Sequence, residues 1–396
     1  MMTLKEENKK LAWTEFSSGS LRLESRPFRA SIEITRNCDL RCVMCAHSWE
    51  PQYTQSRPEY DMTPELFRKI AAELFPYLEQ AHLQGFGESV ISSHWPEILE
   101  ACKLYSKDIR FTIVTNLNKK DDGMWRKMVR MGFKIIFSCD GATPGTFEAI
   151  RRGSRFERIL SNLEAVRKAR ESFKGPELCF LVTLQSGNYR EMPLFIDLAA
   201  RYGAEKVVFS NIHGEASLLK ERFFRLIKRA ERAVMALRGK VPGEDPIGNL
   251  RIYDIPRREL SELRIETLHR AELHGVRVSF IDNFFERTEE KPESENGPSA
   301  ELPADYIDGI ASIVHVARYK KCFKPFSYVV INYKGDIGPC SHLLADGVWE
   351  QMGNIRDTGI TDIWNCARYR QFRRTHLCAS PTSRDCKWCY AHRITE

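Results

Sequence analysis

Three cysteines near the N-terminus, Cys38, Cys42 and Cys45, have the spacing C-x-x-x-C-x-x-C and directly follow a short apolar run at residues 31–35. Cysteine thiolates are the usual ligands of iron–sulfur clusters, and a 4Fe–4S cluster ordinarily takes four of them. Three thiolates leave one iron without a protein ligand, so that iron is open to a substrate or a cofactor. The spacing therefore predicts a 4Fe–4S cluster with one open iron.

Two other interpretations of this triplet stay open on these residues alone. His47 would complete a Cys3His set, and structural zinc sites do use closely spaced cysteines. Single cysteines are also common in hydrophobic cores. Because the neighbours of the triplet are polar, unlike those of a packed core, we favour the cluster. These neighbours are Arg36, Asn37, Asp39 and Arg41.

The cysteine spacing, at the end of a first predicted strand, resembles that of the radical S-adenosylmethionine (radical SAM) superfamily. The resemblance implies that the open iron chelates the amino and carboxylate groups of the methionine part of S-adenosylmethionine (SAM). Met44 takes the position where the family often has an aromatic residue against the adenine, a role that a thioether can fill.

A glycine-rich segment after the second predicted strand, Gly85-Phe86-Gly87-Glu88, is similar to the family's Gly-Gly-Glu segment, with Phe86 in place of a glycine. The family's segment contacts the SAM amino group. Glycine lets the backbone approach a ligand closely, and Glu88 can accept a hydrogen bond from an ammonium. Taken alone, the segment is more typical of an ordinary turn between a strand and a helix than of a cofactor site.

Polar residues also follow the third and fourth predicted strands. Thr115-Asn116 resembles the family's Thr-Asn-Gly turn, with Leu117 replacing the glycine. Ser138-Cys139-Asp140-Gly141 matches the family more closely. By resemblance, Ser138 and Asp140 lie near the SAM ribose.

An arginine in the helix that follows completes the set implied by the resemblance. Arg151 would lie near the SAM carboxylate, since a guanidinium is a rigid two-pronged donor for carboxylates. The alternatives are an exposed helical Arg151, or the same role for Arg152. Gln185, after the fifth strand, would face the barrel interior near the adenosine or the substrate.

A second set of cysteines lies near the C-terminus. Cys322 and Cys340 flank a segment with the pattern of a β-hairpin, whose turn is expected at residues 334–336. Cys386 and Cys389 follow as a C-x-x-C pair. Four thiolates suffice for a fully ligated cluster or for a structural zinc.

The segment between these cysteines is similar to SPASM and twitch domains, which carry auxiliary iron–sulfur clusters in radical SAM enzymes. The similarity lies in residues 352–355, residues 363–365 and Tyr369. The chain has no further cysteine after Cys389, so we expect one auxiliary 4Fe–4S cluster. Cys366 and Cys378 are left as spares, and Cys378 is a candidate substitute ligand. The cysteines expected to be structural are Cys102, Cys139 and Cys179.

Strand and helix patterns alternate from residue 31 to about residue 211, which predicts an α/β fold with a parallel sheet and right-handed crossovers. The family resemblance implies the same arrangement, a partial (β/α)6 TIM-like barrel whose site lies at the carboxyl ends of the strands. The expected strands are 31–35, 81–85, 110–115, 133–138, 178–184 and 205–210. The expected helices are 64–79, 94–106, 122–131, 145–171 and 190–203.

We expect four regions along the chain. Residues 1–30 form an N-terminal extension, and residues 31–285 form the barrel, which includes a basic helix near 219–234 and a strand at 276–281. Residues 286–317 form a linker, whose first part, residues 286–303, is polar and acidic and contains proline, as linkers do. Residues 318–396 form the small cysteine-rich α+β module.

Length and composition set the outer bounds. The chain has 396 residues, enough for a barrel and a second module, and its 42% hydrophobic content is typical of a globular protein. We find no run of about 20 apolar residues that would span a membrane, and no apolar signal core. Twelve cysteines without such a signal favour metal binding in a reducing compartment, and we expect the cytoplasm. The net charge of +7 is mild, so we expect no membrane partner and do not favour nucleic acid.

The resemblance implies an enzyme in which a 4Fe–4S cluster reductively cleaves SAM to a 5′-deoxyadenosyl radical that abstracts hydrogen from a substrate. We expect a small polar metabolite, an amino sugar or a nucleotide sugar, and a net oxidation or rearrangement assisted by the auxiliary cluster. The alternatives are maturation of a ribosomal peptide, modification of RNA, and a non-catalytic zinc-stabilised binding protein. A one-electron donor such as flavodoxin or ferredoxin is the implied partner.

Overall fold

The computed structural model describes residues 2–48, 54–212, 250, 252, 255–280, 313–316, 319–340, 351–378 and 386. The expected alternation of strands and helices is present in the first half of this chain. The strands are β1 (Arg29–Ile32), β2 (Gln80–His82), β3 (Arg110–Thr115), β4 (Lys134–Ser138), β5 (Leu178–Leu184) and β6 (Lys206–Asn211). The helices are α2 (Pro64–Leu74), α3 (Trp95–Lys103), α4 (Asp122–Arg130), α5 (Pro144–Ile150), α6 (Phe156–Phe173) and α7 (Met192–Arg201).

The helix expected at 145–171 is in fact two helices, α5 and α6. The chain breaks between them at Gly153, whose φ of 95° is a left-handed conformation that side chains disfavour. Short 3₁₀ helices occupy several other loops. They are η1 (Ala46–Ser48), η2 (Pro58–Tyr60), η3 (Ser89–Ile91) and η4 (Tyr189–Glu191).

The parallel sheet is longer than the six strands expected from the sequence. Helix α9 (Arg257–His274) leads into β7 (Arg277–Phe280), which pairs in parallel with β6. At the other edge β10 (Tyr328–Ile331) pairs in parallel with β1, followed antiparallel by β11 (Asp336–Gly338) and β12 (Gly353–Asn354). The C-terminal hairpin therefore covers the edge of β1, which would otherwise present unpaired backbone groups.

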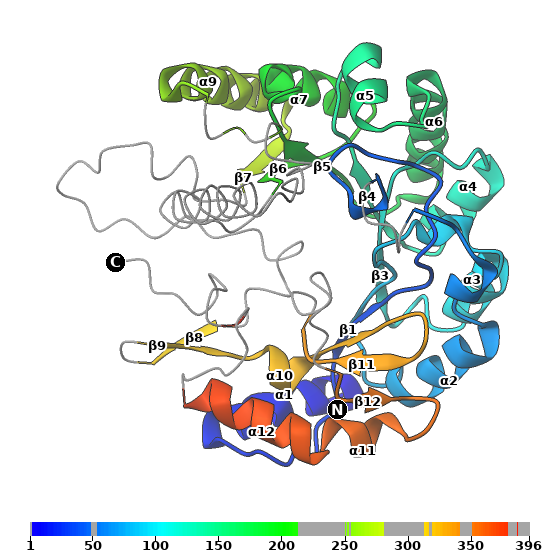
Figure 1. Ribbon diagram of the computed structural model, residues 1–396, viewed down its shortest axis with the longest axis vertical. Helices are drawn as coiled ribbons and strands as arrows, with labels where there is room; N and C mark the ends of the chain where they lie inside the picture. The colour runs from blue at the N-terminus through cyan, green and yellow to red at the C-terminus, as the bar shows by residue number, and fades with distance from the viewer. Residues whose placement is uncertain are drawn as a thin grey trace, which may run out of the picture.

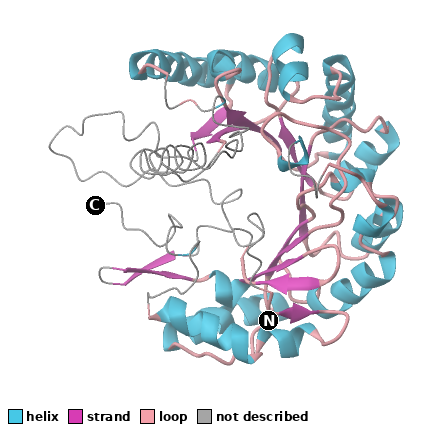
Figure 2. Ribbon diagram, viewed as in Figure 1, coloured by secondary structure: helices cyan, strands magenta, loops and turns pink. Residues whose placement is uncertain are grey.

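The ten-stranded sheet curves but does not close, with order β12-β11-β10-β1-β2-β3-β4-β5-β6-β7. Its helices lie along the outer, convex face and its strands line the inner, concave face (Figures 1 and 2). This is the open parallel sheet of a partial TIM barrel, as expected from the alternation of elements.

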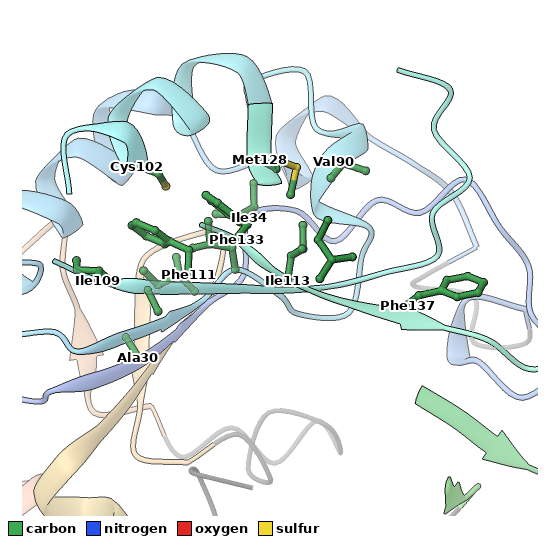
Figure 3. Close-up of a cluster of buried hydrophobic side chains, with 14 of the residues drawn as sticks. Ala30, Ile34, Val90, Cys102, Ile109, Phe111, Ile113, Met128, Phe133 and Phe137 are labelled. Carbon is green, nitrogen blue, oxygen red and sulfur yellow. The ribbon is translucent and has the colours of Figure 1, made fainter. Parts of the chain in front are cut away.

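The main hydrophobic core lies between the sheet and the outer helices. Figure 3 shows Phe111, Ile113 and Phe137 on the strands facing Met128 and Val90 from the helical side. Successive strand residues alternate between the two faces of a sheet. The residues of opposite parity, such as Ile136 and Val208, therefore form a separate apolar cluster on the concave face.

The N-terminal residues pack against the C-terminal module. Helix α1 (Leu4–Ser18) presents Trp13 and Phe16 to Phe323, with the Trp13 and Phe323 rings stacked at 3.9 Å between centroids. The buried Arg373 donates to Leu21 O and to Pro325 O, which joins the same two segments. The module also contains β8 (Ile313–Val316), β9 (Tyr319–Cys322), α10 (Lys324–Ser327), α11 (Ile360–Trp364) and α12 (Ala367–Leu377).

Several expected features lie outside the described residues. These are the basic helix near 219–234, Cys389, and most of the linker, of which residues 313–316 are described as β8, paired with β9. Within the described chain, no helix combines the length and the apolar character needed to cross a membrane.

The turn after β3 keeps a glycine-like backbone although it has a leucine. Leu117 has a φ of 57° and its side chain is fully buried, so packing outweighs backbone strain here. The Asn162 side-chain amide holds the turn by donating to Leu117 O at 2.6 Å and to Lys119 O at 3.1 Å. The turn conformation of the family motif thus survives the loss of its glycine.

We predict opposite effects of glycine at two left-handed positions. Leu117→Gly relieves about 1–2 kcal/mol of strain but removes a buried leucine side chain worth about 3–5 kcal/mol, so it destabilises by about 2 kcal/mol. Lys174→Gly, at an exposed helix end with φ 48°, removes only strain and is neutral or stabilising by up to about 1 kcal/mol. Urea unfolding of both variants measures this. Equal signs would contradict the account.

Candidate metal centre and cofactor site

The three N-terminal cysteines lie on one loop that begins after β1. The end of α5 holds the loop, because Arg41 N donates to Arg152 O and Val43 N donates to Ile150 O, both at 2.9 Å. Cys42 is buried and the other two cysteines are half-buried. The sequence prediction of a cysteine loop at the carboxyl end of the first strand agrees with this placement.

The glycine segment after β2 lies directly against this loop. A Cβ atom on Gly87 would lie 2.3 Å from Asn37 O and 2.5 Å from Thr35 O, distances that real atoms do not adopt. The next amide, Glu88 N, donates to Asn37 O at 2.8 Å. Gly87 is therefore required for backbone packing against the cysteine loop, a reason that the motif alone did not reveal.

The Glu88 carboxylate is buried and connects β2 to the turn after β3. Its two oxygens accept from Thr115 Oγ1 at 2.8 Å and from Asn116 N at 2.6 Å. Burial raises the pKa of Glu88 to about 7, while these two hydrogen bonds oppose the rise. Carboxylate oxygens have further lone pairs, so Glu88 keeps capacity to accept from an amino group.

A second link, which the sequence analysis did not identify, joins the same turn to the cysteine loop. Asn116 Nδ2 and Asn118 Nδ2 donate to the two oxygens of Asp39 at 2.8 Å and 2.7 Å. Asn116 Nδ2 also lies 4.0 Å from Cys38 Sγ. The only sequence signal for this link is the pair of asparagines two residues apart.

Arg151 is part of the same site and is not an exposed helical arginine. Its Nη2 lies 2.6 Å from Asp140 Oδ2, and its Nη1 lies 3.9 Å from Cys42 Sγ. Arg152, the alternative in the sequence, is exposed. Burial raises the pKa of the Cys42 thiol to about 11, and the Arg151 guanidinium opposes this rise.

Asp140 positions this arginine. Its Oδ1 accepts from Thr183 N at 2.8 Å and its Oδ2 pairs with Arg151, so both carboxylate oxygens are engaged within the protein. A direct contact of Asp140 with a ribose stays a prediction. Ser138 is half-buried at the end of β4, on the same strand face as Ile136 in the concave cluster.

Gln185, the residue directly after β5, has the surroundings expected of a ligand-binding residue. Its side chain is fully buried, yet neither its amide oxygen nor its amide nitrogen has a hydrogen-bond partner. Buried polar groups are nearly always paired, so a bound group with both a donor and an acceptor fits here. Met44, by contrast, is half-buried and Gly85 is exposed, which leaves both accessible to a cofactor.

The buried carboxylate of Glu33, the residue directly after β1, packs against the glycine segment at residues 85–87. Glu33 Oε1 accepts from Phe86 N at 2.9 Å, and a Cβ atom on Gly85 would lie 2.3 Å from Glu33 Cγ. Burial raises the pKa of Glu33, while the Phe86 amide and the Arg36 guanidinium oppose this. Glycine at position 85 is thus required by Glu33 as well as by any ligand.

In the C-terminal module, the structure brings Cys322 and Cys340 together around Lys324. Lys324 Nζ donates to Cys340 Sγ at 3.6 Å, and the Lys324 backbone amide donates to Cys322 Sγ. Burial and the neighbouring Cys340 raise the pKa of Cys322 to about 11, with Lys324 opposing the rise. Cys386 is buried, and Cys389 lies outside the described residues.

The two spare cysteines differ in their surroundings. Cys366 Sγ caps helix α12, since it accepts from Tyr369 N at 3.4 Å and donates to Met352 O at 3.6 Å. Cys378 is exposed at the other end of the same helix. The three cysteines that were expected to be structural are fully buried. They are Cys102, Cys139 and Cys179.

None of the described cysteines is in a disulfide bond. No group of three or more His, Cys, Asp or Glu side chains in the described ranges is arranged to hold a single metal ion. In a 4Fe–4S cluster each thiolate binds a different iron, so cluster ligands do not meet at one point.

Comparison with known families agrees with this arrangement. The model of the radical SAM superfamily matches residues 32–185, and the model of the SPASM iron–sulfur cluster-binding domain matches residues 322–390. Residues 32–185 thus match a radical SAM domain, and residues 322–390 match a SPASM domain. The first match implies SAM and a 4Fe–4S cluster as cofactors, and the second implies auxiliary iron–sulfur binding. A non-catalytic zinc-stabilised protein does not agree with these two matches.

Individual relatives are distant. A tungsten-containing aldehyde ferredoxin oxidoreductase cofactor-modifying protein from Pyrococcus furiosus is 25% identical over 187 residues, which are 46% of this chain and 50% of that protein. The chain thus spans half the length of this curated relative. Streptococcus suis SuiB bound to SAM is similar in structure, with a TM-score of 0.59 at 14% identity over 97% of this chain and 76% of that chain.

The structure of anSMEcpe with bound SAM is also similar, with a TM-score of 0.57 at 15% identity over 92% of this chain and 86% of that chain. At these identities the two structures show the shared fold.

We predict that Gly87→Ala prevents normal binding of the N-terminal cluster, because its Cβ atom forces Thr35 and Asn37 away and displaces the cysteine loop. Gly145→Ala in α5 is the matched control, since a Cβ atom there meets nothing within 4 Å. Iron counting after anaerobic reconstitution should show a loss of about four irons for the first variant only. Full iron content in Gly87→Ala would refute the close-packing argument.

Proposed function

We propose that this radical SAM enzyme abstracts a hydrogen atom from a small polar metabolite, an amino sugar or a nucleotide sugar, in a net oxidation or rearrangement. The observation that carries the substrate class is the polar band on the concave face. Three half-buried hydroxyl residues form this band, namely Ser138, Thr183 and Ser210. Each lies two positions after a residue that belongs to the apolar cluster on the concave face or packs against that cluster. Three hydroxyl groups on the same face of the sheet suit a ligand that has many hydrogen-bonding groups.

The unpartnered amide of Gln185 continues this band by one more step of the same strand face, after Thr183. In this proposal it contacts either the adenosine of SAM or the substrate. A purely apolar substrate would leave both the hydroxyls and this amide without partners, at a cost of about 1–3 kcal/mol for each group.

The residues around the cysteine loop would hold the cofactors. Cys38, Cys42 and Cys45 would hold the cluster and leave one iron open to SAM. When bound, the cluster and SAM together would supply a 5′-deoxyadenosyl radical. Glu88 would accept from the SAM amino group, and Arg151, which is held by Asp140 and lies beside Cys42, would donate to the SAM carboxylate.

The C-terminal cysteines would hold one auxiliary 4Fe–4S cluster through Cys322, Cys340, Cys386 and Cys389. The fit rests on the chemistry of the buried donors there, because Lys324 Nζ, the Tyr369 hydroxyl and Arg373 Nη2 all lie in this module and the last two have no acceptor. An anionic cluster supplies acceptors without adding donors. A one-electron donor such as flavodoxin or ferredoxin would serve it, in the reducing setting of the cytoplasm.

Maturation of a ribosomal peptide is the second candidate substrate class. Its support is the similarity in fold to SuiB, which has also been solved bound to the precursor peptide SuiA, with a TM-score of 0.57 at 14% identity. RNA modification was suggested by the net charge of +7 and by the basic helix near 219–234, and that helix lies outside the described residues.

A substrate screen separates these classes. Reconstituted enzyme with SAM and a reductant should form 5′-deoxyadenosine faster with amino sugars or nucleotide sugars than without substrate, and Cys42→Ala should form none. Gly145→Ala, which adds a Cβ atom that meets nothing within 4 Å, is the control and should retain activity. Stimulation by precursor-type peptides but by no sugar would replace the metabolite with a peptide substrate.

Iron content tests the auxiliary site separately. We predict that Cys322→Ala loses about four irons while the N-terminal cluster still cleaves SAM in an uncoupled reaction. Iron and sulfide analysis, with Gly145→Ala alongside as the control, measures this. Unchanged iron in Cys322→Ala would show that this cysteine is not a ligand.

A further inference from the structure

Lys324 is a buried lysine placed between two cysteines of the C-terminal module. Only 6% of it is exposed, although lysine is rarely buried without a specific partner. Its ammonium donates to Cys340 Sγ, and its backbone amide donates to Cys322 Sγ. One residue therefore donates a hydrogen bond to each of two sulfurs, and one of these bonds comes from a positive charge.

Two further buried donors on α12 lie in the same module. The Tyr369 hydroxyl has no acceptor, and Cys340 and Cys366 both lie close enough to affect its ionisation electrostatically. Arg373 Nη2 likewise has no acceptor, and its guanidinium lies 4.8 Å from the centre of the Tyr369 ring. Cys340 therefore lies near two donors, the Lys324 ammonium and the Tyr369 hydroxyl, and Arg373 adds positive charge beside the Tyr369 ring.

These features have a defined effect on a cluster bound to the two cysteines. Reduction adds a negative charge, and both hydrogen bonds to the sulfurs and nearby positive charge stabilise the reduced form. We propose that Lys324 raises the reduction potential of the auxiliary cluster, which favours transfer of an electron to that cluster in the proposed oxidation. This inference rests on the proposed role of Cys322 and Cys340 as ligands of that cluster.

With the auxiliary cluster as acceptor, every electron removed from the substrate is accounted for. A two-electron oxidation of a C–H/O–H or C–H/N–H unit removes one hydrogen atom to the deoxyadenosyl radical, which becomes 5′-deoxyadenosine. The remaining substrate radical loses one electron to the oxidised auxiliary cluster and one proton to solvent, which leaves a C=O or C=N bond. A raised cluster potential favours this second step over return of the hydrogen atom.

The test is a redox titration of the auxiliary cluster alone, in which electron paramagnetic resonance monitors the reduced cluster. The full chain carries Cys38→Ala, Cys42→Ala and Cys45→Ala, so that only the C-terminal cysteines can bind a cluster. On this background we compare Lys324→Met, which removes the charge, Lys324→Gln, which keeps a neutral donor, and Lys324→Arg, which keeps the charge. Lys119→Met is the matched control, because its ammonium donates to Val90 O and not to a cysteine.

We expect Lys324→Met to keep its irons and to have a more negative midpoint potential, with Lys324→Gln intermediate. Lys324→Arg and Lys119→Met should stay near the parent value. An unchanged potential in fully loaded Lys324→Met would overturn the inference. If Lys324→Met loses its cluster, Lys324→Gln decides by the same criterion. Loss of the cluster from both, with Lys119→Met loaded, would also overturn it and give Lys324 a role in assembly.

Failure of the proposed function has a different signature. If the parent with the three N-terminal alanines binds no iron at all, the C-terminal cysteines do not hold a cluster, and the proposed auxiliary site is wrong. If it binds about four irons whose potential does not respond to Lys324, the site is right and only the inference about Lys324 fails.

Discussion

The site depends on the close approach of two backbone segments, the loop that carries the three cysteines and the turn at Gly87. Two carbonyl oxygens, those of Thr35 and Asn37, occupy the space that any side chain at position 87 would need. Because this contact fixes Gly87, it also fixes Glu88, whose carboxylate then reaches the turn after β3. One contact that only glycine allows thus connects the ends of three strands, β1, β2 and β3.

Around this contact, charged groups are held by specific partners. The exposed Asp39 accepts from two asparagine amides, and the buried Arg151 lies between the buried Asp140 and Cys42. A buried charge without a partner is strongly unfavourable, so each pair fixes the position of both members. The cysteine loop is thus held in place before any cluster binds, which lowers the entropy cost of binding it.

The ten-stranded sheet connects the N-terminal cysteine loop to the hairpin of the C-terminal module. Strand β10 of the C-terminal module pairs in parallel with β1, whose end leads into the cysteine loop. Glu33 strengthens this connection, since its carboxylate accepts from Phe86 N on one side and lies 3.5 Å from Tyr333 N on the other. The strand before the cysteine loop and the hairpin of the C-terminal module are therefore joined directly by backbone hydrogen bonds.

The sequence by itself determined the alternation of strands and helices, the positions of the motifs at strand ends, and the hairpin turn at Gly335, whose φ is 94°. These features follow from local periodicity and local backbone preference, which a sequence displays directly. Only the tertiary structure decided that Arg151 is buried, that Leu117 keeps a left-handed backbone, that β10 pairs with β1, and that Lys324 lies between two cysteines. Each of these depends on contacts between segments distant along the chain, whose packing energy outweighs local preference and leaves no periodic trace in the sequence.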